Sequence, residues 1–280
     1  MEHYLTGYEQ FLQNISKSRH TVKQYVLDAK HFIRFWSHQE QEELAFSDVI
    51  AAYRAYLQQT YKVTTINRKL AGTRKFVLFM YDRDYIDSFN DALFEPFEKE
   101  QPALHYLTKG QIHHIQQTLH QLLQQAKDEE EQFLATRHIA MFELFYTTGI
   151  KPFEAIRMQW QHIEDDQLTV LHNDQYRHVT LTANAKRALT ALKRQNELLV
   201  GPNDYVWLGL GNKRGEPITE KTIERCFQAL SKYVGLKVTA TVCRYTFMKY
   251  ADDNVFEQAG YTRKDNMKER LNKLQPKDKV

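Results

Sequence analysis

The chain has 280 residues, of which 42% are hydrophobic and 26% are charged, and its formal net charge is +3. This composition is typical of a folded globular protein and excludes a disordered or collagen-like chain. The first residues, MEHYLTGYEQF, lack the basic and apolar segments of a secretory signal, and the sequence contains no apolar run long enough to span a bilayer. We therefore expect a cytosolic protein that does not engage a membrane.

Cysteine and histidine usage predicts no metal site and no cofactor. Cys226 and Cys243 are too few for a disulfide framework, and neither has the spacing of a zinc motif, so we interpret both as buried thiols. The twelve histidines also lack convergent ligand spacing.

The basic excess of the chain is local. Residues 1–95 contain twelve basic and twelve acidic side chains, whereas the last twenty residues contain seven basic and three acidic ones. A mild net charge permits nucleic-acid binding without requiring it. Any such binding must therefore depend on patches.

The first ninety residues show the three-to-four-residue apolar spacing of amphipathic helices. In YEQFLQNI, for example, Tyr8, Phe11 and Leu12 fall on one helical face. Three further helices are predicted in SKSRHTVKQYVLDAKHFIRFWSH, SDVIAAYRAYLQQTY and TTINRKLAGTRKFVLFMYDRDYI. Four helices with short connections predict a small bundle.

Two prolines and mixed charges then interrupt the helical period. We predict a linker over residues 96–104 between domains at 1–95 and 105–280. The second domain resumes with helical patterns, of which EEQFLATRHIAMFELFYTTG ends at Gly149. The segment IEDDQLTVLHNDQYRHVTLTANA alternates apolar and polar residues, which predicts a hairpin or small antiparallel sheet before helices return.

Several segments carry a resemblance to one family, in order along the chain. VKQYVLDAKHFIRFW and TTINRKLAGTRKFVLFMYDRDYI are similar to its core-binding domain, and YTTGIKPFEAIRMQWQHI to the entry of its catalytic domain. RHVTLT resembles its strand pair, ATVCRYTFMKYA its H-x-x-R-H-T-F box, and VFEQAGYTRKDNMKERL its closing L-G-H-x-x-x-x-T-x-x-Y motif. The family is that of the tyrosine recombinases, also called phage integrases.

The resemblance implies a mainly α fold. It comprises an N-terminal four-helix, SAM-like core-binding domain that clamps one face of duplex DNA. A C-terminal domain of the integrase catalytic fold follows, helical with a small antiparallel sheet. In this family a tyrosine hydroxyl attacks a DNA phosphate, two arginines hold its oxygens, and a lysine protonates the departing sugar oxygen.

The resemblance places the six active-site positions of the family at Lys151, His172, Thr241, Arg244, Tyr261 and Arg270. Only Arg244 keeps the family's residue type, and Arg270 stands where the nucleophile is expected. Lysine lacks the bidentate fork of arginine, and histidine is seldom charged at neutral pH. We therefore expect a degenerate site and no enzyme activity. Tyr261 as a displaced nucleophile is an alternative, and a packing role for Tyr261 is another.

Many changed positions remain hydrogen-bond donors, so we expect a pocket that holds a phosphate without cutting it. Pocket contacts are predicted at Lys151, Arg177, Arg244 and Arg270. Contacts from the N-terminal helices are predicted at Arg19, Lys23, Arg68, Lys69, Arg74 and Lys75, with Ser18, His20, Thr21 and Asn67 beside them. Contacts from the C-terminal domain are predicted at Lys213, Arg214, Lys221 and Arg225, with Thr219 and Thr222 at the same helix start.

Each contact has a structural alternative. A basic residue on a helix is equally well explained by an ordinary solvent-exposed face. The predicted phosphate pocket could instead be a basic hollow without a ligand. Arg244 could instead have a structural role, with hydrogen bonds to loop carbonyls. The sequence favours a non-catalytic, sequence-specific binder of double-stranded DNA, a transcriptional repressor of phage or mobile-element origin that self-associates on DNA or has a phage-encoded regulatory partner. The alternatives are a divergent tyrosine recombinase and an accessory factor to an active one.

Overall fold

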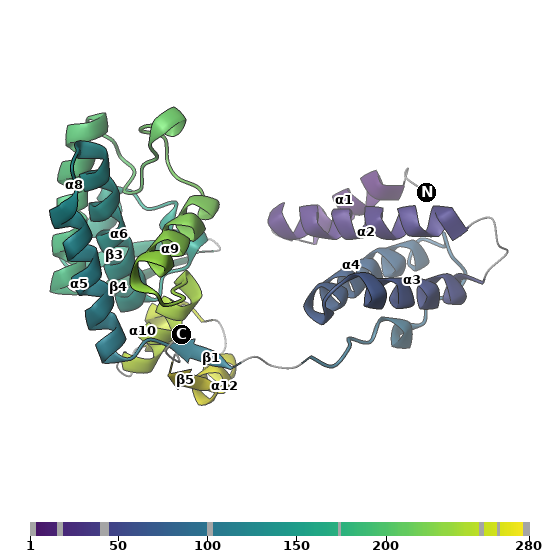
Figure 1. Ribbon diagram of the computed structural model, residues 1–280. Coiled ribbons are helices and arrows are strands. Elements are labelled where there is room, and N and C mark those ends of the chain that lie inside the picture. Colours follow the sequence, from purple (N-terminus) through teal and green to yellow (C-terminus); the bar gives the residue numbers. More distant parts are fainter. Residues whose placement is uncertain are drawn as a thin grey trace. The chain divides into compact units, whose positions relative to one another are not determined.

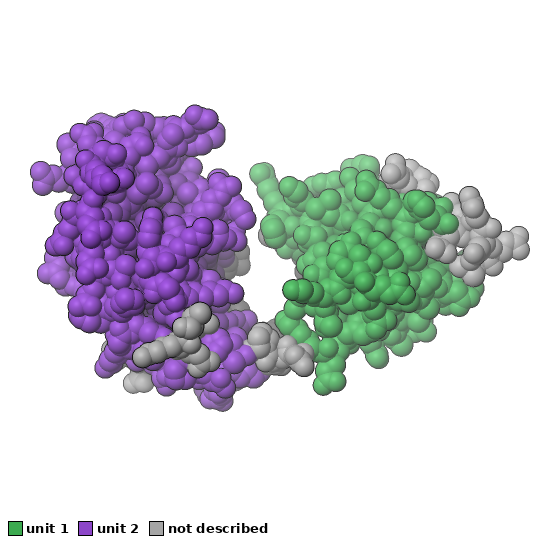
Figure 2. All heavy atoms as spheres, in the orientation of Figure 1, with its two compact units in different colours: residues 1–101 green, residues 102–280 purple. Residues whose placement is uncertain are grey.

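The computed structural model describes residues 4–15, 19–39, 45–99, 103–172, 175–251, 255–261 and 264–276. The chain divides into two compact units, Met1–Gln101 and Pro102–Val280, which Figures 1 and 2 distinguish. The division falls within the range predicted for the linker, although Leu104 already belongs to a strand. None of the described helices combines the length and apolar character that crossing a bilayer requires.

Unit 1 is the four-helix domain that the apolar spacing predicts. Its helices are α1 (Tyr4–Asn14), α2 (Arg19–Gln39), α3 (Phe46–Thr60) and α4 (Val63–Tyr81), followed by the short 3-10 helix η1 (Asp91–Phe94). Their apolar faces meet in one aromatic core, in which Tyr8, Phe32, Tyr53 and Phe76 are fully buried. The expected four-helix domain is confirmed.

Helices α2 and α4 approach closely at Gly72. A Cβ atom on this glycine would lie 2.7 Å from Oδ2 of Asp28, which is 1% exposed. Arg68 donates to the same oxygen at 2.5 Å, and the Lys69 ammonium lies 3.9 Å from Oδ1. Burial raises the pKa of Asp28, and the two cations oppose that rise. Two of the cations predicted to contact DNA therefore stabilise a helix pair.

Unit 2 is built around one central helix, α6 (Glu129–Thr148). Figure 1 shows it among the long helices α5 (Lys109–Gln125), α8 (Ala183–Val200), α9 (Glu220–Val234) and α10 (Ala240–Tyr250). Phe133, Phe142 and Phe145 of α6 are fully buried. Gly149 ends the helix with a left-handed φ of 62°, as its position in the sequence predicts.

The predicted antiparallel sheet is confirmed in unit 2. It has the order β2 (Ile163–Glu164), β3 (Gln167–His172) and β4 (Gln175–Thr180), and Val170 pairs with Arg177. The sheet is contacted by the short helices η2 (Trp160–His162), α7 (Pro152–Ala155) and α11 (Val255–Gln258), and unit 2 also contains η3 (Gly211–Lys213) and α12 (Lys264–Asn272). Cys226 and Cys243 are buried free thiols, as expected.

A second, parallel strand pair was not predicted. Leu104–Tyr106 (β1) pairs with Leu274–Pro276 (β5), so that the start of unit 2 is joined to the segment after α12. Each strand has three residues, which is too short for alternation to indicate a strand in the sequence.

Candidate active site

Two cations of unit 2, Arg177 and Lys151, contact one buried carboxylate. The Glu154 side chain is completely buried, and Arg177 donates from Nη1 and Nη2 to its Oε1 and Oε2, both at 2.8 Å. The Lys151 ammonium lies 3.7 Å from Oε1. Burial by itself would raise the pKa of Glu154, but hydrogen bonds and charge from Arg177 outweigh it and hold that pKa below its usual value. The carboxylate is therefore ionised and neutralises part of the cluster.

Local sequence explains how these side chains reach one place. Lys151 is the N-cap of α7, Pro152 follows at the first helical position, and the Lys151 backbone N–H donates to Glu154 Oε2 at 2.8 Å. In β4, alternate residues face the core, which directs Arg177 and Val179 inward and leaves His178 exposed. Burial lowers the pKa of Lys151, and Glu154 opposes that effect.

These two cations and Arg244, together called the cation cluster, each donate to a backbone carbonyl of residues 258–260. Arg177 Nε donates to Gln258 at 3.0 Å, Arg244 Nη2 to Ala259 at 2.6 Å, and Lys151 Nζ to Gly260 at 3.4 Å. Gly260 has a φ of 62°, and a Cβ there would lie 2.9 Å from Arg177 Cζ. Three successive carbonyls thus occupy donors that the sequence predicts to hold a phosphate.

Tyr261 follows this turn and packs on Arg244. Its ring centroid lies 4.8 Å from Arg244 Cζ, and its hydroxyl donates to Met248 Sδ at 3.4 Å. Arg244 also donates to the Gly149 carbonyl. Burial lowers the pKa of Arg244, and the neighbouring Tyr261 opposes that shift. The alternative that Arg244 binds loop carbonyls is therefore observed, and Tyr261 lies at the cation cluster.

The other predicted pocket positions lie apart from these contacts. Arg270 lies on α12 and donates to the Tyr245 hydroxyl at 3.0 Å. Thr241 is exposed in the first turn of α10 and lines a groove of about 790 Å³ beside α9, with Lys221 and Lys237. His172 ends β3, and its side chain lies outside the described residues. The structure thus brings together Lys151, Arg177, Arg244 and Tyr261 from the predicted set.

The prediction that the basic residues of α4 point outward and contact DNA requires correction. Lys69 is buried, at 8% exposure, because its position falls on the packed face of α4, where its ammonium lies 5.0 Å from the Tyr61 ring centroid. Arg74 is paired with Asp91, at 2.8 Å between Nη2 and Oδ2. The Asn67 side chain exchanges two 2.8 Å hydrogen bonds with the backbone of Phe97 and so fixes the chain after η1.

The remaining predicted contacts divide between exposed and paired cations. Arg19, Lys23 and Arg225 are exposed, and Lys75 lies 5.6 Å from the Phe11 ring centroid. Ser18 lies outside the described residues.

Near η3 and the start of α9, the cations have local partners. Lys213 pairs with Glu216 at 2.7 Å, Lys221 pairs with Glu224 at 3.0 Å, and Arg214 donates to the Leu199 carbonyl at 3.0 Å. The Lys213 and Lys221 pairs are exposed, and such pairs are weak enough to exchange for phosphate.

Sequence reasoning missed Glu154. The prediction considered only basic residues, whereas Lys151 and Arg177 both pair with Glu154, which is the one acid in GIKPFEAI. Its position three residues after Lys151, with proline directly after Lys151, is the spacing of a capping box and was the available signal.

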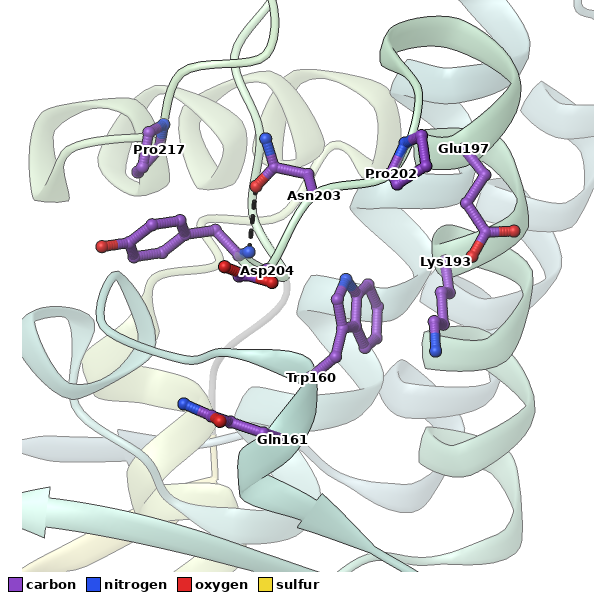
Figure 3. A pocket seen from close by; sticks show the side chains of 9 residues that line it. Trp160, Gln161, Lys193, Glu197, Pro202, Asn203, Asp204 and Pro217 are labelled. Carbon is purple, nitrogen blue, oxygen red and sulfur yellow. Dashed lines mark hydrogen bonds between the residues drawn. The ribbon is translucent and has the colours of Figure 1, made fainter.

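A hollow of about 650 Å³ elsewhere in unit 2 shares none of these residues. Figure 3 shows Trp160 beside Lys193, with Glu197 on the same helix as Lys193 and Asp204 on a loop at the other side of Trp160. The Lys193 ammonium lies 5.6 Å from the Trp160 ring. Two acids against one lysine make this hollow unsuited to a DNA phosphate.

Two protein-family models match this chain, one over each unit. Residues 5–84 match the model of the "Phage integrase, N-terminal SAM-like domain", and residues 107–249 match that of the "Phage integrase family". The chain belongs to the phage integrase family. The expected membership is confirmed for both units of the chain.

Individual relatives are distant but extensive. The chain is 25% identical over 243 residues to Tyrosine recombinase XerC of Anoxybacillus flavithermus, a match that covers 82% of this chain and 77% of the relative. It is 25% identical over 239 residues to Tyrosine recombinase XerC of Listeria innocua, with the same two shares covered.

Solved structures show the same fold. A lambda integrase (75–356) dimer bound to a COC' core site matches with a TM-score of 0.71 at 16% identity, over 96% of this chain and 94% of that one. The XerH recombinase bound to difH, in a pre-cleavage complex, matches with a TM-score of 0.69 at 15% identity, over 89% and 76%.

These comparisons correct the function predicted from the sequence. The expected non-catalytic transcriptional repressor is contradicted, because the matched relatives are named tyrosine recombinases and the structural neighbours are recombinases on DNA. The prediction rests on replaced side chains alone. A changed residue type does not by itself exclude chemistry at a site, and it gives no evidence for a regulatory role.

Proposed function

We propose that this protein binds duplex DNA and acts in site-specific recombination as a divergent tyrosine recombinase. The position of Tyr261 carries the proposal, since its ring lies on the Arg244 guanidinium, which shares the docked turn with Lys151 and Arg177. A nucleophile must lie beside the cations that hold the phosphate, because negative charge builds on its oxygens in the transition state. The extended match to XerC proteins supports the same assignment.

The proposed step is a transfer of the phosphoryl group to tyrosine. A bond forms between the Tyr261 phenolic oxygen and phosphorus, the bond from phosphorus to the sugar oxygen breaks, and the phenolic proton leaves to solvent. Lys151 supplies the proton that the departing oxygen takes up. Burial lowers the pKa of Lys151, which makes its ammonium a better acid than an exposed lysine, whereas arginine does not release a proton.

The carbonyls of residues 258–260 set a condition on this chemistry. They accept hydrogen bonds from the donors that the phosphate needs, so that phosphate binding and this docked turn compete. We infer that DNA displaces the turn and thereby frees the Tyr261 hydroxyl from Met248.

A suicide DNA substrate tests the proposal. DNA fragments recovered with the protein from a genomic library are nicked near the binding site, so that cleavage traps a covalent protein–DNA adduct. We expect an adduct with the unaltered chain and with Tyr250→Phe, an exposed tyrosine of α10, and none with Tyr261→Phe. An adduct that persists in Tyr261→Phe would overturn the assignment of the nucleophile.

A second candidate is an accessory factor that binds DNA beside an active recombinase. The position expected for the nucleophile holds Arg270, which donates to the Tyr245 hydroxyl, and this observation favours the accessory role. The same experiment separates the two. An accessory factor forms no adduct alone but binds the recovered DNA and changes the cleavage rate of an added active recombinase. In either role we propose self-association on DNA, as in the lambda integrase dimer.

A further inference from the structure

A small hollow of unit 2 lies where the ends of α5 and α9 meet the first half of α6. Its volume is about 260 Å³. Leu122 and Leu134 form apolar walls, and His138 and Tyr233 contribute their rings. Among the described residues that line it, Glu131 alone is an acid or a base with a full charge at neutral pH. The hollow shares no residue with the cation cluster.

His138 gives this hollow a polar group without a partner. The residue is 9% exposed, and its ring makes no hydrogen bond with any described residue. Its nitrogens are nevertheless not among the unpartnered atoms that are closed off from solvent, so they keep accessible surface where His138 lines the hollow. A neutral imidazole has one donor and one acceptor, and buried polar groups are normally paired. A molecule in the hollow can therefore reach both.

The surrounding charges restrict that molecule to a neutral one. Burial lowers the pKa of His138 to about 4, so the ring offers no positive charge to an anion near pH 7. The Arg137 charge already acts on the ring and disfavours a cation. Glu131 is engaged at the start of α6, where its Oε2 accepts the Lys127 backbone N–H at 2.8 Å. The described residues also contain no group of three or more His, Cys, Asp or Glu side chains arranged to hold a metal ion.

Size and shape favour a single aromatic ring. A cavity of about 150 Å³ accommodates benzene, so 260 Å³ has room for one ring with a small substituent. The Tyr233 ring centroid lies 6.4 Å from that of His138, with an angle of 63° between the planes, and Tyr233 is exposed. Aromatic rings prefer such edge contacts, so a further ring between Leu122 and Leu134 finds an aromatic neighbour in Tyr233.

We propose that this hollow binds a small neutral phenol, with its hydroxyl hydrogen-bonded to the His138 ring and its aromatic ring between Leu122, Leu134 and Tyr233. A free phenol and the tyrosine side chain of a partner protein share this chemistry. The assignment is independent of the proposed recombination, because it uses none of the residues at the candidate active site.

The test is a fluorine NMR titration of the full chain with 4-fluorophenol and with fluorobenzene, which lacks the hydroxyl. We expect saturable binding of 4-fluorophenol. Replacing His138 with leucine should lower the ratio of the two affinities, 4-fluorophenol over fluorobenzene, by about fivefold, as expected for one lost hydrogen bond between neutral groups. Because the same two ligands are compared in both proteins, their difference in apolar character cancels.

Ala126→Leu provides a second variant that keeps His138. Ala126 is a half-buried lining residue, and a larger side chain there should fill the hollow and weaken both ligands by about tenfold or more. Ala191→Leu is the matched control, because Ala191 lies on α8 in a different groove, and it should leave binding unchanged. The proposal is overturned by the absence of saturable binding, by an unchanged affinity ratio in His138→Leu, or by unchanged binding to Ala126→Leu.

Competition with N-acetyltyrosinamide distinguishes the two sources of the phenol. Displacement of 4-fluorophenol at equal or lower concentration than by free phenol would assign the ring to a tyrosine side chain of a partner. Displacement only at higher concentration would assign it to a free phenol, because the added backbone then does not fit.

Discussion

Arg177 holds both carboxylate oxygens of Glu154, each at 2.8 Å, and at the same time donates from Nε to the Gln258 carbonyl. One side chain of β4 therefore fixes the start of α7 and the turn before Tyr261. The ion pair of Arg177 and Glu154 is shielded from solvent, since the Arg177 side chain is 13% exposed and that of Glu154 is fully buried. Removing one partner would leave an uncompensated buried charge.

Arg177→Ala should therefore lower the free energy of unfolding by about 3 kcal/mol, as expected when one member of a buried pair is lost. Urea titration followed by circular dichroism measures the change. Lys213→Ala removes a member of an exposed pair, with Lys213 74% and Glu216 56% exposed, and should cost less than about 1 kcal/mol. Equal costs for the two variants would show that the Arg177 pair contributes no more than a surface pair.

Arg244→Ala should weaken DNA binding across sequences and reduce the slope of log affinity against log salt by about 1, as expected for one lost phosphate contact. Gel-shift titrations at several salt concentrations give both quantities. If affinity falls while the slope stays the same, Arg244 acts only through its bonds to Gly149 and Ala259.

Gly260→Ala should both destabilise unit 2 and strengthen DNA binding. Its φ of 62° and the 2.9 Å approach of a Cβ to Arg177 strain the docked turn, which we expect to cost about 1–2 kcal/mol and to free donors for phosphate. Gly235→Ala is the matched control, because its φ is also 62° but a Cβ there meets nothing within 4 Å. Weaker DNA binding by Gly260→Ala would mean that the docked turn does not compete with DNA.

His138 should make stability fall as the solution is acidified. Burial, with a smaller effect from the Arg137 charge, lowers its pKa from 6.5 to about 4. The unfolded chain therefore takes up the proton at higher pH than the folded chain, so stability present above pH 6.5 is lost progressively toward pH 4, by at most about 3 kcal/mol. Urea unfolding of the unaltered chain and of His138→Gln between pH 7.5 and 5 checks this, since the variant should lose that part of the slope. An unchanged slope would contradict the assignment.

The sequence predicts most of the fold because its signals are local. Apolar spacing defines the helices of unit 1, alternation defines the β3–β4 hairpin, and Gly149 marks the end of α6. The short strands β1 and β5 lie about 170 residues apart, and neither has a periodic pattern that points to the other.

The candidate site is less predictable because its interactions are distant along the chain. Arg177 and Glu154 are 23 residues apart, and the partner of Lys69, Asp28, lies on another helix. Motif matching located Lys151, Arg244 and Tyr261, but counting basic residues did not distinguish a cation facing solvent from one already paired. The prediction of a repressor rested on replaced catalytic side chains alone. The matched relatives, which are named recombinases, contradict it.

The parallel pairing of Leu104 with Leu274 limits how far the segment carrying Tyr261 can move. Upstream, that segment begins where α10 ends at Tyr250, and downstream it is fastened to the first strand of the same unit. If DNA displaces the turn as proposed, the segment between α10 and β5 would change shape while both of its ends stay attached to unit 2. Tyr261 would then remain tethered on both sides to the unit that carries Arg244.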